Sequence, residues 1–405
     1  MNFDSLVASA GQSEFHLELR EFLDSILPDG RLQLPRDPAE RLRVLRDWQA
    51  AMAEGGWAGI HWPVEYGGRD ATLAQNVVYN VELTRRGLPA FPGHRGLALV
   101  GPGIIAHGTE EQKARYLPKI RTAEELWAGG FSEPDAGSDL ASLRTRADID
   151  GDTVVINGQK IWTSQAARCD MIYTLVRTDA TGPKHQGITV VLVPLHSPGV
   201  TVRPIRQISG ARGFCEVFFD DVSVPTANIL GPVGDGWRVN RTTMAHEHFT
   251  NFIPAQARYS RTLDQVVALA RSPIAPGGAR PGDDPHLRNR VGRAWADSQM
   301  LLVNGLRNLA RVTAGGMPGP EGSIAKLFGQ EFEKAMHELA LDITGPAGVL
   351  DRGADGTPER GRWLFGYLAA RATTIGGGTS EIHRGKIAEQ VLGLPRDPWN
   401  EHEDL

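Results

Sequence analysis

Residues 129–232 contain short runs of β-branched and aromatic residues that predict β-strands. On both sides of this block, apolar residues recur every three or four positions, which predicts helices. Asp150-Gly151 and Asn157-Gly158 are two hairpin signals in this block. Because runs of one class followed by runs of another indicate separate layers rather than alternating βα units, the pattern predicts an α+β fold and disfavours a Rossmann fold. Further strands are expected in runs rich in β-branched and aromatic residues: MIYTLVRTD, GITVVLVPL, VTVRPI and CEVFFDDVSV.

The chain is too long for a single core, because its 405 residues predict two or three domains. Apolar residues recur every three or four positions from Ser13 to about Glu125. Helical patterns return from Gly234, with an interruption expected at Pro254. We therefore expect three domains, a helical domain over 1–128, a β domain over 129–232 and a helical bundle over 233–405.

Composition and charge exclude several classes of function. The formal net charge is -5 and the Lys and Arg residues are scattered, so we expect no nucleic-acid partner. No apolar run approaches the ~18 residues of a spanning helix, and no secretory leader begins the sequence, so we expect no membrane insertion. Cys169 and Cys215 form no CxxC pair. A reducing cytoplasm is the expected compartment.

The stretch from Gly129 to Ala166 is the strongest candidate for a ligand site. It opens with GGFSEPDAGSDLASL, where backbone amides freed by Ala136 and Gly137, with the Ser132 and Ser138 hydroxyls, can face an electron-rich ligand edge. An ordinary capped turn is the plainer interpretation of this segment on its own.

The same stretch closes on KIWTSQA, at the end of an expected strand. Trp162 offers a flat apolar wall, and Thr163 and Ser164 offer hydrogen-bonding groups beside it, which suits a planar heteroaromatic cofactor. A strand Trp is more often part of a core, so this motif alone also has a structural interpretation.

The two motifs together resemble the flavin-binding core of the acyl-CoA dehydrogenase family, through FSEPDAGSDLASL and NGQKIWTSQA. GWAGIHWPVEYGG and HGTEEQKARYLPKI resemble segments of that family's N-terminal helical domain. The resemblance covers nearly the whole chain. It implies an N-terminal helical domain, a middle β-barrel-like domain and a C-terminal four-helix bundle.

The resemblance implies oxidation of an acyl-CoA to its trans-2-enoyl-CoA, with FAD taking the electrons. A base must remove the α-proton while the β-hydrogen leaves as hydride to flavin N5. Many members carry this base in a Tyr-Glu-Gly-Thr segment, which here reads Gly376-Gly377-Gly378-Thr379. Gly377 would then contribute only its backbone N–H to the thioester oxygen.

Another branch of the family places the base on the first helix of the C-terminal bundle, and Glu247 in TTMAHEHF matches that position. The plainer interpretation is a solvated helical Glu. His248 stands where the family commonly has an Arg, and it is expected next to the substrate. It would either tune the pKa of Glu247 or only pack against its neighbours. HEH lacks the i, i+4 spacing of HExxH, so no metal is expected.

The family's cofactor contacts carry over by position. Phe131 and Ser132 would face the flavin ring, and Ser138 would lie towards the pyrophosphate or the substrate. Asp342 and Pro346 depart from the frequent Gln and Gly, and the loop before His286 replaces the usual Arg-x-x-Phe segment. The plainer interpretation of GPAG is that its glycines cap helices, which suits GGGTSE less well. Trp162, Thr163 and Ser164 would form the opposing wall of the flavin site, and Thr379 and Glu381 would contact FAD near its diphosphate. The loop from Gly345 to Gly348 would receive the adenine half of FAD from a neighbouring subunit, and Arg288 is a candidate substitute for the missing Arg.

The resemblance also implies partners: an electron-transferring flavoprotein as acceptor, and a second copy in a homodimer or tetramer. Two alternatives stay open. The chain could be a non-catalytic or half-site subunit of a heteromeric acyl-CoA dehydrogenase, or an acyl-CoA oxidase or flavin monooxygenase on the same fold. The sequence does not indicate the acyl group: straight, branched, sterol and xenobiotic thioesters are all compatible.

Overall fold

The computed structural model of this chain describes residues 13–27, 29–273, 277–313 and 319–395, without the side chains of 242, 244–254, 257, 309, 312 and 313. The chain divides into two compact units, Met1–Thr250 and Asn251–Leu405, which we describe separately. The three domain ranges expected from the sequence stay a prediction.

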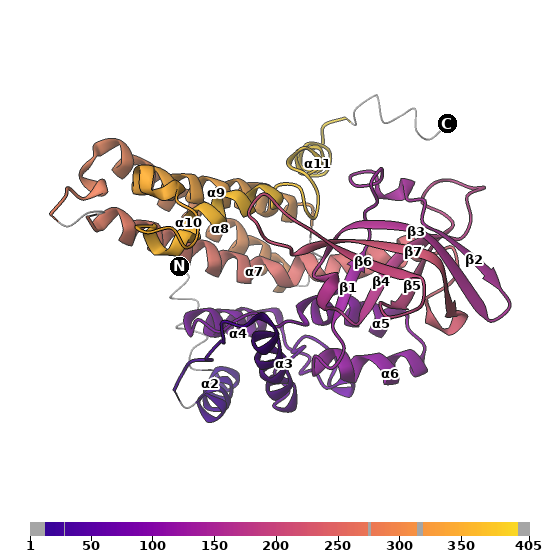
Figure 1. Cartoon of the computed structure of the whole chain (residues 1–405). Coiled ribbons are helices and arrows are strands. Elements are labelled where there is room, and N and C mark those ends of the chain that lie inside the picture. The colour runs from indigo at the N-terminus through magenta and orange to yellow at the C-terminus, as the bar shows by residue number, and fades with distance from the viewer. Residues whose placement is uncertain (1–12, 28, 274–276, 314–318, 396–405) are drawn as a thin grey trace. The chain divides into compact units, whose positions relative to one another are not determined.

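The N-terminal part of the first unit is helical, as predicted (Figure 1). Side-chain caps start these helices: Ser13 and Asp37 accept from the third backbone N–H of their helices, while Thr72 and Thr109 form capping boxes with Gln75 and Gln112. The helices are α2 Glu14–Ile26, α3 Pro38–Glu54, α4 Leu73–Arg85, α5 Gly101–His107 and α6 Glu110–Arg121.

The aromatic loop after α3 packs between these helices. Trp57 and Trp62 are fully buried, and Trp57 stacks on Tyr79 of α4 at a centroid distance of 6.3 Å. The Tyr79 hydroxyl donates to the Trp57 carbonyl (2.6 Å), and the Trp62 indole N–H donates to the Leu97 carbonyl (2.9 Å). The motif therefore acts in packing between helices.

One eight-stranded sheet follows in the first unit, with the strand order β6-β7-β3-β2-β4-β5-β8 and with β1 paired parallel to β4 (Figure 1). Residues of β4 and β5 are buried on both faces, because one face packs on the helical core and the other on β3 and β7. The strands are β1 Trp127–Gly130, β2 Arg146–Asp150, β3 Thr153–Ser164, β4 Met171–Arg177, β5 Ile188–Pro194, β6 Val200–Ile205, β7 Phe214–Pro225 and β8 Ile229–Leu230.

Of the two hairpin signals, the first is confirmed and the second is wrong. β2 and β3 pair antiparallel across a two-residue turn that begins at Gly151. Asn157 and Gly158 lie inside β3, at a bulge against β7. Gly158 adopts φ +148°, and an ideal Cβ there would lie 2.7 Å from the Thr145 Cα. Close backbone approach, rather than a turn, accounts for this glycine.

The second unit is a helical bundle. The helix α7 begins in the first unit, and its backbone stays helical through Pro254, so the interruption expected there is wrong. A proline removes one helical hydrogen bond, which does not end a helix of 36 residues. No described helix is long and apolar enough to cross a membrane. The helices are α7 Gly236–Arg271, α8 Pro285–Thr313, α9 Gly322–Thr344, α10 Arg362–Ala369 and α11 Ser380–Lys386.

A half-buried histidine joins α9 to α10. The His337 ring lies 5.8 Å from the Trp363 ring, and an ideal Cβ at Gly366 would lie 2.2 Å from its Cε1. Burial, helped by the positive charge of Arg362, lowers the pKa of His337 to about 4. The folded unit therefore favours the neutral imidazole.

We expect acid to destabilise the second unit through His337. Because its folded pKa lies below the ordinary value of 6.5, its contribution is complete above pH 6.5 and is lost as the pH falls towards 4, by about 3 kcal/mol. Urea unfolding followed at pH 7, 5.5 and 4.5 should show a smaller loss for His337→Gln than for the wild type. Equal pH dependence of the two proteins would contradict this expectation.

Candidate functional site

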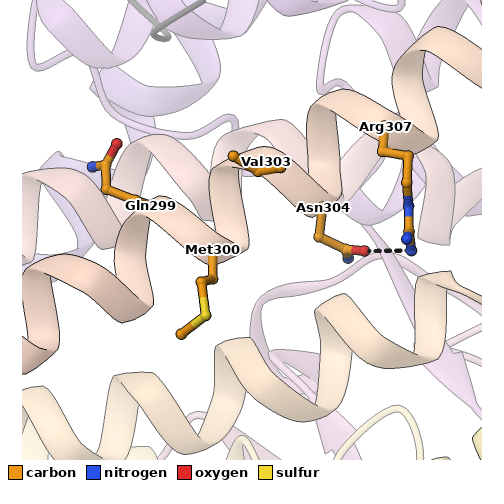
Figure 2. Close-up of a pocket in the computed structure, with 5 residues that line it drawn as sticks. All are labelled: Gln299, Met300, Val303, Asn304 and Arg307. Atoms are coloured by element: carbon orange, nitrogen blue, oxygen red, sulfur yellow. Dashed lines mark hydrogen bonds between the residues drawn. The ribbon is translucent and has the colours of Figure 1, made fainter.

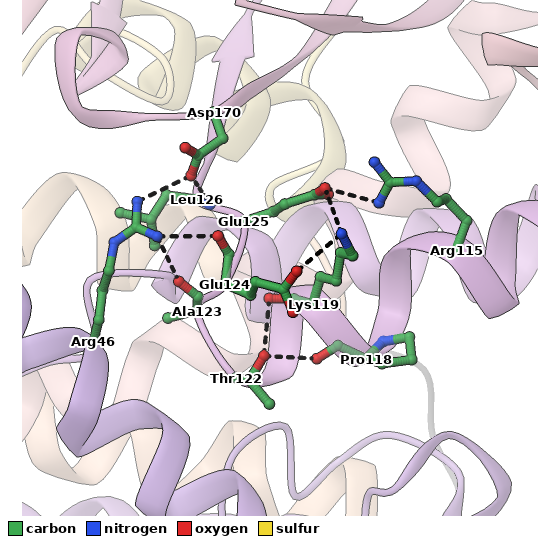
Figure 3. A network of polar contacts seen from close by, with 10 residues as sticks. All are labelled: Arg46, Arg115, Pro118, Lys119, Thr122, Ala123, Glu124, Glu125, Leu126 and Asp170. Atoms are coloured by element: carbon green, nitrogen blue, oxygen red, sulfur yellow. Dashed lines mark hydrogen bonds and ion pairs between the residues drawn. The ribbon is translucent and has the colours of Figure 1, made fainter.

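A network of polar contacts fixes the start of β1 against α3 (Figure 3). The Arg46 guanidinium donates to the carbonyls of Ala123 (2.9 Å) and Glu124 (3.0 Å), and pairs with the Asp170 carboxylate at 3.0 Å. Asp170 also accepts from the Leu126 N–H at 2.7 Å. The loop that follows β1 therefore starts from a fixed point.

The serine-rich loop after β1 turns tightly and is tied to β3. The backbone groups of Glu133 and Ala136 exchange hydrogen bonds of 3.0 and 3.1 Å. The Ile161 N–H donates to the Ser132 carbonyl at 2.9 Å. Ser132 is half-buried and Ser138 is exposed. The structure thus brings the two predicted motifs side by side.

A buried ion pair holds this loop against β3. The Lys160 ammonium donates to the Glu133 carboxylate (2.8 Å) and to the Phe131 carbonyl (3.1 Å). Glu133 also accepts from the backbone N–H groups of Arg144 (2.6 Å) and Thr145 (2.8 Å). Burial lowers the pKa of Lys160 to about 8. The pKa of Glu133 is lowered although burial opposes it, because Lys160 and the hydrogen bonds favour the carboxylate, so the pair is ionic at neutral pH.

Trp162 has a strained backbone and an exposed side chain. It lies at a second bulge of β3, where Lys160 pairs with Val217 and Thr163 with Cys215. Its φ is +58°, which is rare for a bulky residue, and the side chain is 56% exposed with its ring edge-on to Phe214. Strain of this kind clusters at ligand sites. The bulge turns the indole outward, as a cofactor wall requires.

The neighbouring hydroxyl gives a test of whether the site fits a polar planar group. Thr163 is buried, and its Oγ1 has no hydrogen-bond partner among the described residues. Buried hydroxyls are nearly always hydrogen-bonded, so this one fits a bound acceptor or donor. Ser164 is half-buried, and Phe131 packs edge-on against Tyr173 at 5.8 Å. The residues present fit a flat, hydrogen-bonding cofactor.

In the second unit, the segment in which many family members carry the base forms an exposed glycine loop before α11. Gly377 and Gly378 have φ of +72° and +106°. The Lys326 ammonium, from α9, donates to the Gly376 carbonyl at 2.7 Å. Thr379 caps α11 by accepting from the Ile382 N–H at 3.3 Å. The first turn of α11 therefore follows directly from the loop.

The other expected cofactor residues of this unit lie on three elements. Glu381 is exposed on α11, and hydrogen bonds from its own N–H and from Thr379 lower its pKa. Gly345 and Gly348 lie in the short 3-10 helix Gly345–Val349 after α9. Arg288 is exposed in the first turn of α8. An ion pair between Arg290 and Asp342 (2.7 Å) links that part of α8 to the end of α9.

The side chains of Glu247 and His248 lie outside the described residues, so the proposed base and its neighbour stay predictions; only their helical backbone in α7 is described. Among the residues whose side chains are described, no group of three or more His, Cys, Asp or Glu could hold a metal ion.

A hollow of about 330 Å³ on α8 is separate from these motifs (Figure 2). Met300 and Val303 line it, and Asn304 accepts a hydrogen bond from Arg307 at 2.9 Å. Among the residues whose side chains are described, none that is expected to bind cofactor or substrate lines it.

Three family descriptions match the chain in succession: acyl-CoA dehydrogenase N-terminal domain over residues 9–124, middle domain over 128–222 and C-terminal domain over 234–392. Acyl-CoA dehydrogenase IpdE1 of Mycobacterium tuberculosis is 41% identical over 364 residues, which cover 88% of this chain and 90% of that protein. The chain belongs to the acyl-CoA dehydrogenase family. It is an enzyme of that class.

Solved acyl-CoA dehydrogenases share the fold. The structure titled Tcur3481-Tcur3483 steroid ACAD matches with a TM-score of 0.81 and 32% identity, over 96% of this chain and 98% of that one. A chain of the ChsE4-ChsE5 complex from Mycobacterium tuberculosis matches with a TM-score of 0.80 and 30% identity, over 95% and 99%. The acyl-CoA dehydrogenase fold expected from the sequence is thus confirmed.

Sequence reasoning missed three residues of this acyl-CoA dehydrogenase that hold the candidate loops: Glu133, Lys160 and Lys326. Glu133 and Lys160 lie inside the two quoted motifs, and the signal that could have found them is a charge of each sign in segments otherwise expected to be half-buried. Nothing in the sequence marks Lys326, because it acts on a loop 50 residues further along the chain.

We expect the ion pair to couple stability to cofactor retention. Lys160→Met should destabilise the first unit by about 3–5 kcal/mol, because it leaves the Glu133 carboxylate buried without its cation. Adding Glu133→Gln should recover part of that loss. Urea unfolding of the two single variants and the double variant, with the visible flavin absorbance of each purified protein, measures both effects. Additive losses of unfolding free energy would show that the pair is not coupled.

Proposed function

We propose that this chain catalyses the α,β-dehydrogenation of an acyl-CoA to its trans-2-enoyl-CoA with FAD, and that Glu247 is the base. The observation that carries the proposal is the outward, strained Trp162 beside the buried Thr163 hydroxyl, which has no hydrogen-bond partner among the described residues, within the family's flavin motif. This family generally binds FAD. Bound FAD supplies the acceptor for the β-hydride.

The chain's own residues would bind the flavin and the substrate, remove the α-proton and stabilise the charge on the thioester oxygen. Phe131, Ser132, Trp162, Thr163 and Ser164 would hold the flavin ring, and Ser138 would bind the pyrophosphate or the substrate. Glu247 would take the α-proton, with His248 adjusting its pKa or packing next to it. The Gly377 N–H would donate to the thioester oxygen, where negative charge develops as the α-proton leaves.

The second unit carries the other residues proposed to contact FAD. Thr379 and Glu381 would lie near the FAD diphosphate, and Gly345, Gly348 and Arg288 would receive the adenine half from a neighbouring subunit. Such sharing implies a homodimer or tetramer. An electron-transferring flavoprotein would reoxidise the flavin.

A second candidate function is one subunit of a heteromeric acyl-CoA dehydrogenase. The observation that favours it is the likeness to a chain of the ChsE4-ChsE5 complex, which joins two differently named proteins. A chain of this kind would purify without stoichiometric flavin alone and would retain flavin when co-purified with its partner. The yellow colour of the isolated chain decides between the two candidates.

The experiment is anaerobic bleaching of bound flavin by a panel of acyl-CoAs, with Glu247→Gln beside the wild type. The panel should include a steroid-derived acyl-CoA, because a solved relative is titled a steroid ACAD. We expect Glu247→Gln to retain flavin and to lose about 10²–10⁴-fold in reduction rate, because the α-proton loses its acceptor.

Glu338→Gln is the matched control, since Glu338 pairs with Arg371 on the second unit at 2.8 Å and stands in no proposed site. It should reduce at the wild-type rate. If Glu247→Gln reduces as fast as this control, the base lies elsewhere. Oxygen consumption with the best substrate tests the oxidase alternative.

A further inference from the structure

Two side chains hold the backbone of the glycine loop Gly376–Gly378. The Lys326 ammonium donates to the Gly376 carbonyl at 2.7 Å, and the His383 Nε2 lies 3.2 Å from the Gly377 carbonyl. Three consecutive glycines have more backbone freedom than any other tripeptide. The orientation of each peptide group in this loop therefore depends on such contacts.

The contact from Lys326 also sets the direction of the next N–H group. The Gly376 carbonyl and the Gly377 N–H belong to one planar trans peptide, in which the two point in opposite directions. Holding the oxygen toward Lys326 aims the Gly377 N–H away from α9. A cation on the oxygen also polarises the peptide, which makes its N–H a stronger hydrogen-bond donor.

The side chain of Lys326 lies next to the position that a side chain at residue 377 would occupy. An ideal Cβ at Gly377 would lie 3.3 Å from the Lys326 Nζ and 3.4 Å from its Cε. In this chain an ammonium group therefore lies beside the position where many family members begin the side chain of a carboxylate base.

We propose that Lys326 is a positioning residue for the dehydrogenation, which orients and polarises the Gly376–Gly377 peptide so that the Gly377 N–H binds the thioester oxygen. This inference rests on the proposed function. It assigns to Lys326 the part of transition-state stabilisation that depends on the strength of that N–H donor.

A purely structural anchor would need a hydrogen bond but no charge. Lys326→Gln keeps a donor without the cation, Lys326→Arg keeps both, and Lys326→Met removes both. Lys334→Met is the control, because Lys334 lies on the same helix and pairs with Glu331 at 3.0 Å. Comparing the four variants separates anchoring from polarisation.

The test uses the FAD-loaded holoenzyme and acetoacetyl-CoA, whose α-proton is acidic enough to titrate. The pKa of the bound ligand, followed by the absorbance of its enolate, reports how well the site stabilises negative charge on the thioester oxygen. We expect Lys326→Met to raise that pKa by about one unit, roughly a tenfold weaker stabilisation and less than the 10²–10³-fold cost of losing an oxyanion donor outright. The ligand pKa in Lys326→Gln should lie between those of the wild type and Lys326→Met, and the ligand pKa in Lys326→Arg should equal that of the wild type.

A ligand pKa that is the same for Lys326→Met and Lys334→Met would overturn the inference while leaving the proposed function intact. Equal values for Lys326→Gln and the wild type would reduce Lys326 to an anchor. If the wild type forms no enolate and no acyl-CoA bleaches it, the proposed function fails, and the assignment of Lys326 to this reaction fails with it. Deuterium exchange of the peptide spanning the glycine loop tests the clamp separately, since Lys326→Met should speed exchange there.

Discussion

The ion pair between Glu133 and Lys160 is the contact on which the cofactor half of the first unit depends. Glu133 sits in the loop after β1 and Lys160 on β3, and each is buried. Ser132 directly precedes the carboxylate, and Trp162 follows the ammonium by two residues. Because the same ammonium also holds the Phe131 carbonyl, a single buried cation fixes the loop and the strand to each other.

Charge, rather than apolar packing, suits this position for a geometric reason. The Glu133 carboxylate accepts from Lys160 and from two backbone N–H groups, so its hydrogen bonds have fixed directions. Apolar contacts between the loop and β3 would allow the loop to slide along the strand. A buried pair gives little net stability, but when one partner is lost the other stays buried and unpaired, which strongly disfavours any other arrangement.

Much of the fold follows from the sequence, since caps, periodicity and strand composition are local. The limits are instructive at two glycines. Asp150-Gly151 and Asn157-Gly158 give the same turn signal, yet only the first is a turn. The second is decided by Thr145, whose backbone lies too close to Gly158 for any side chain. Similarly, Pro254 reads locally as a helix break, but α7 continues through it. The contacts that decide these cases are remote in sequence.

In the candidate site, too, local sequence predicts some features and contacts that are remote in sequence decide others, and Gly377 is the clearest example. The resemblance marks it as the place where a base is missing, but only the structure shows the ammonium of Lys326 beside it. A carboxylate at this position would begin 3.3 Å from that cation, and the ion pair would lower its pKa and make it a weak base. Placing the base on α7 and a cation at the glycine loop are therefore consistent with each other. In our proposal the loop then acts only through its backbone N–H, which a neighbouring cation strengthens.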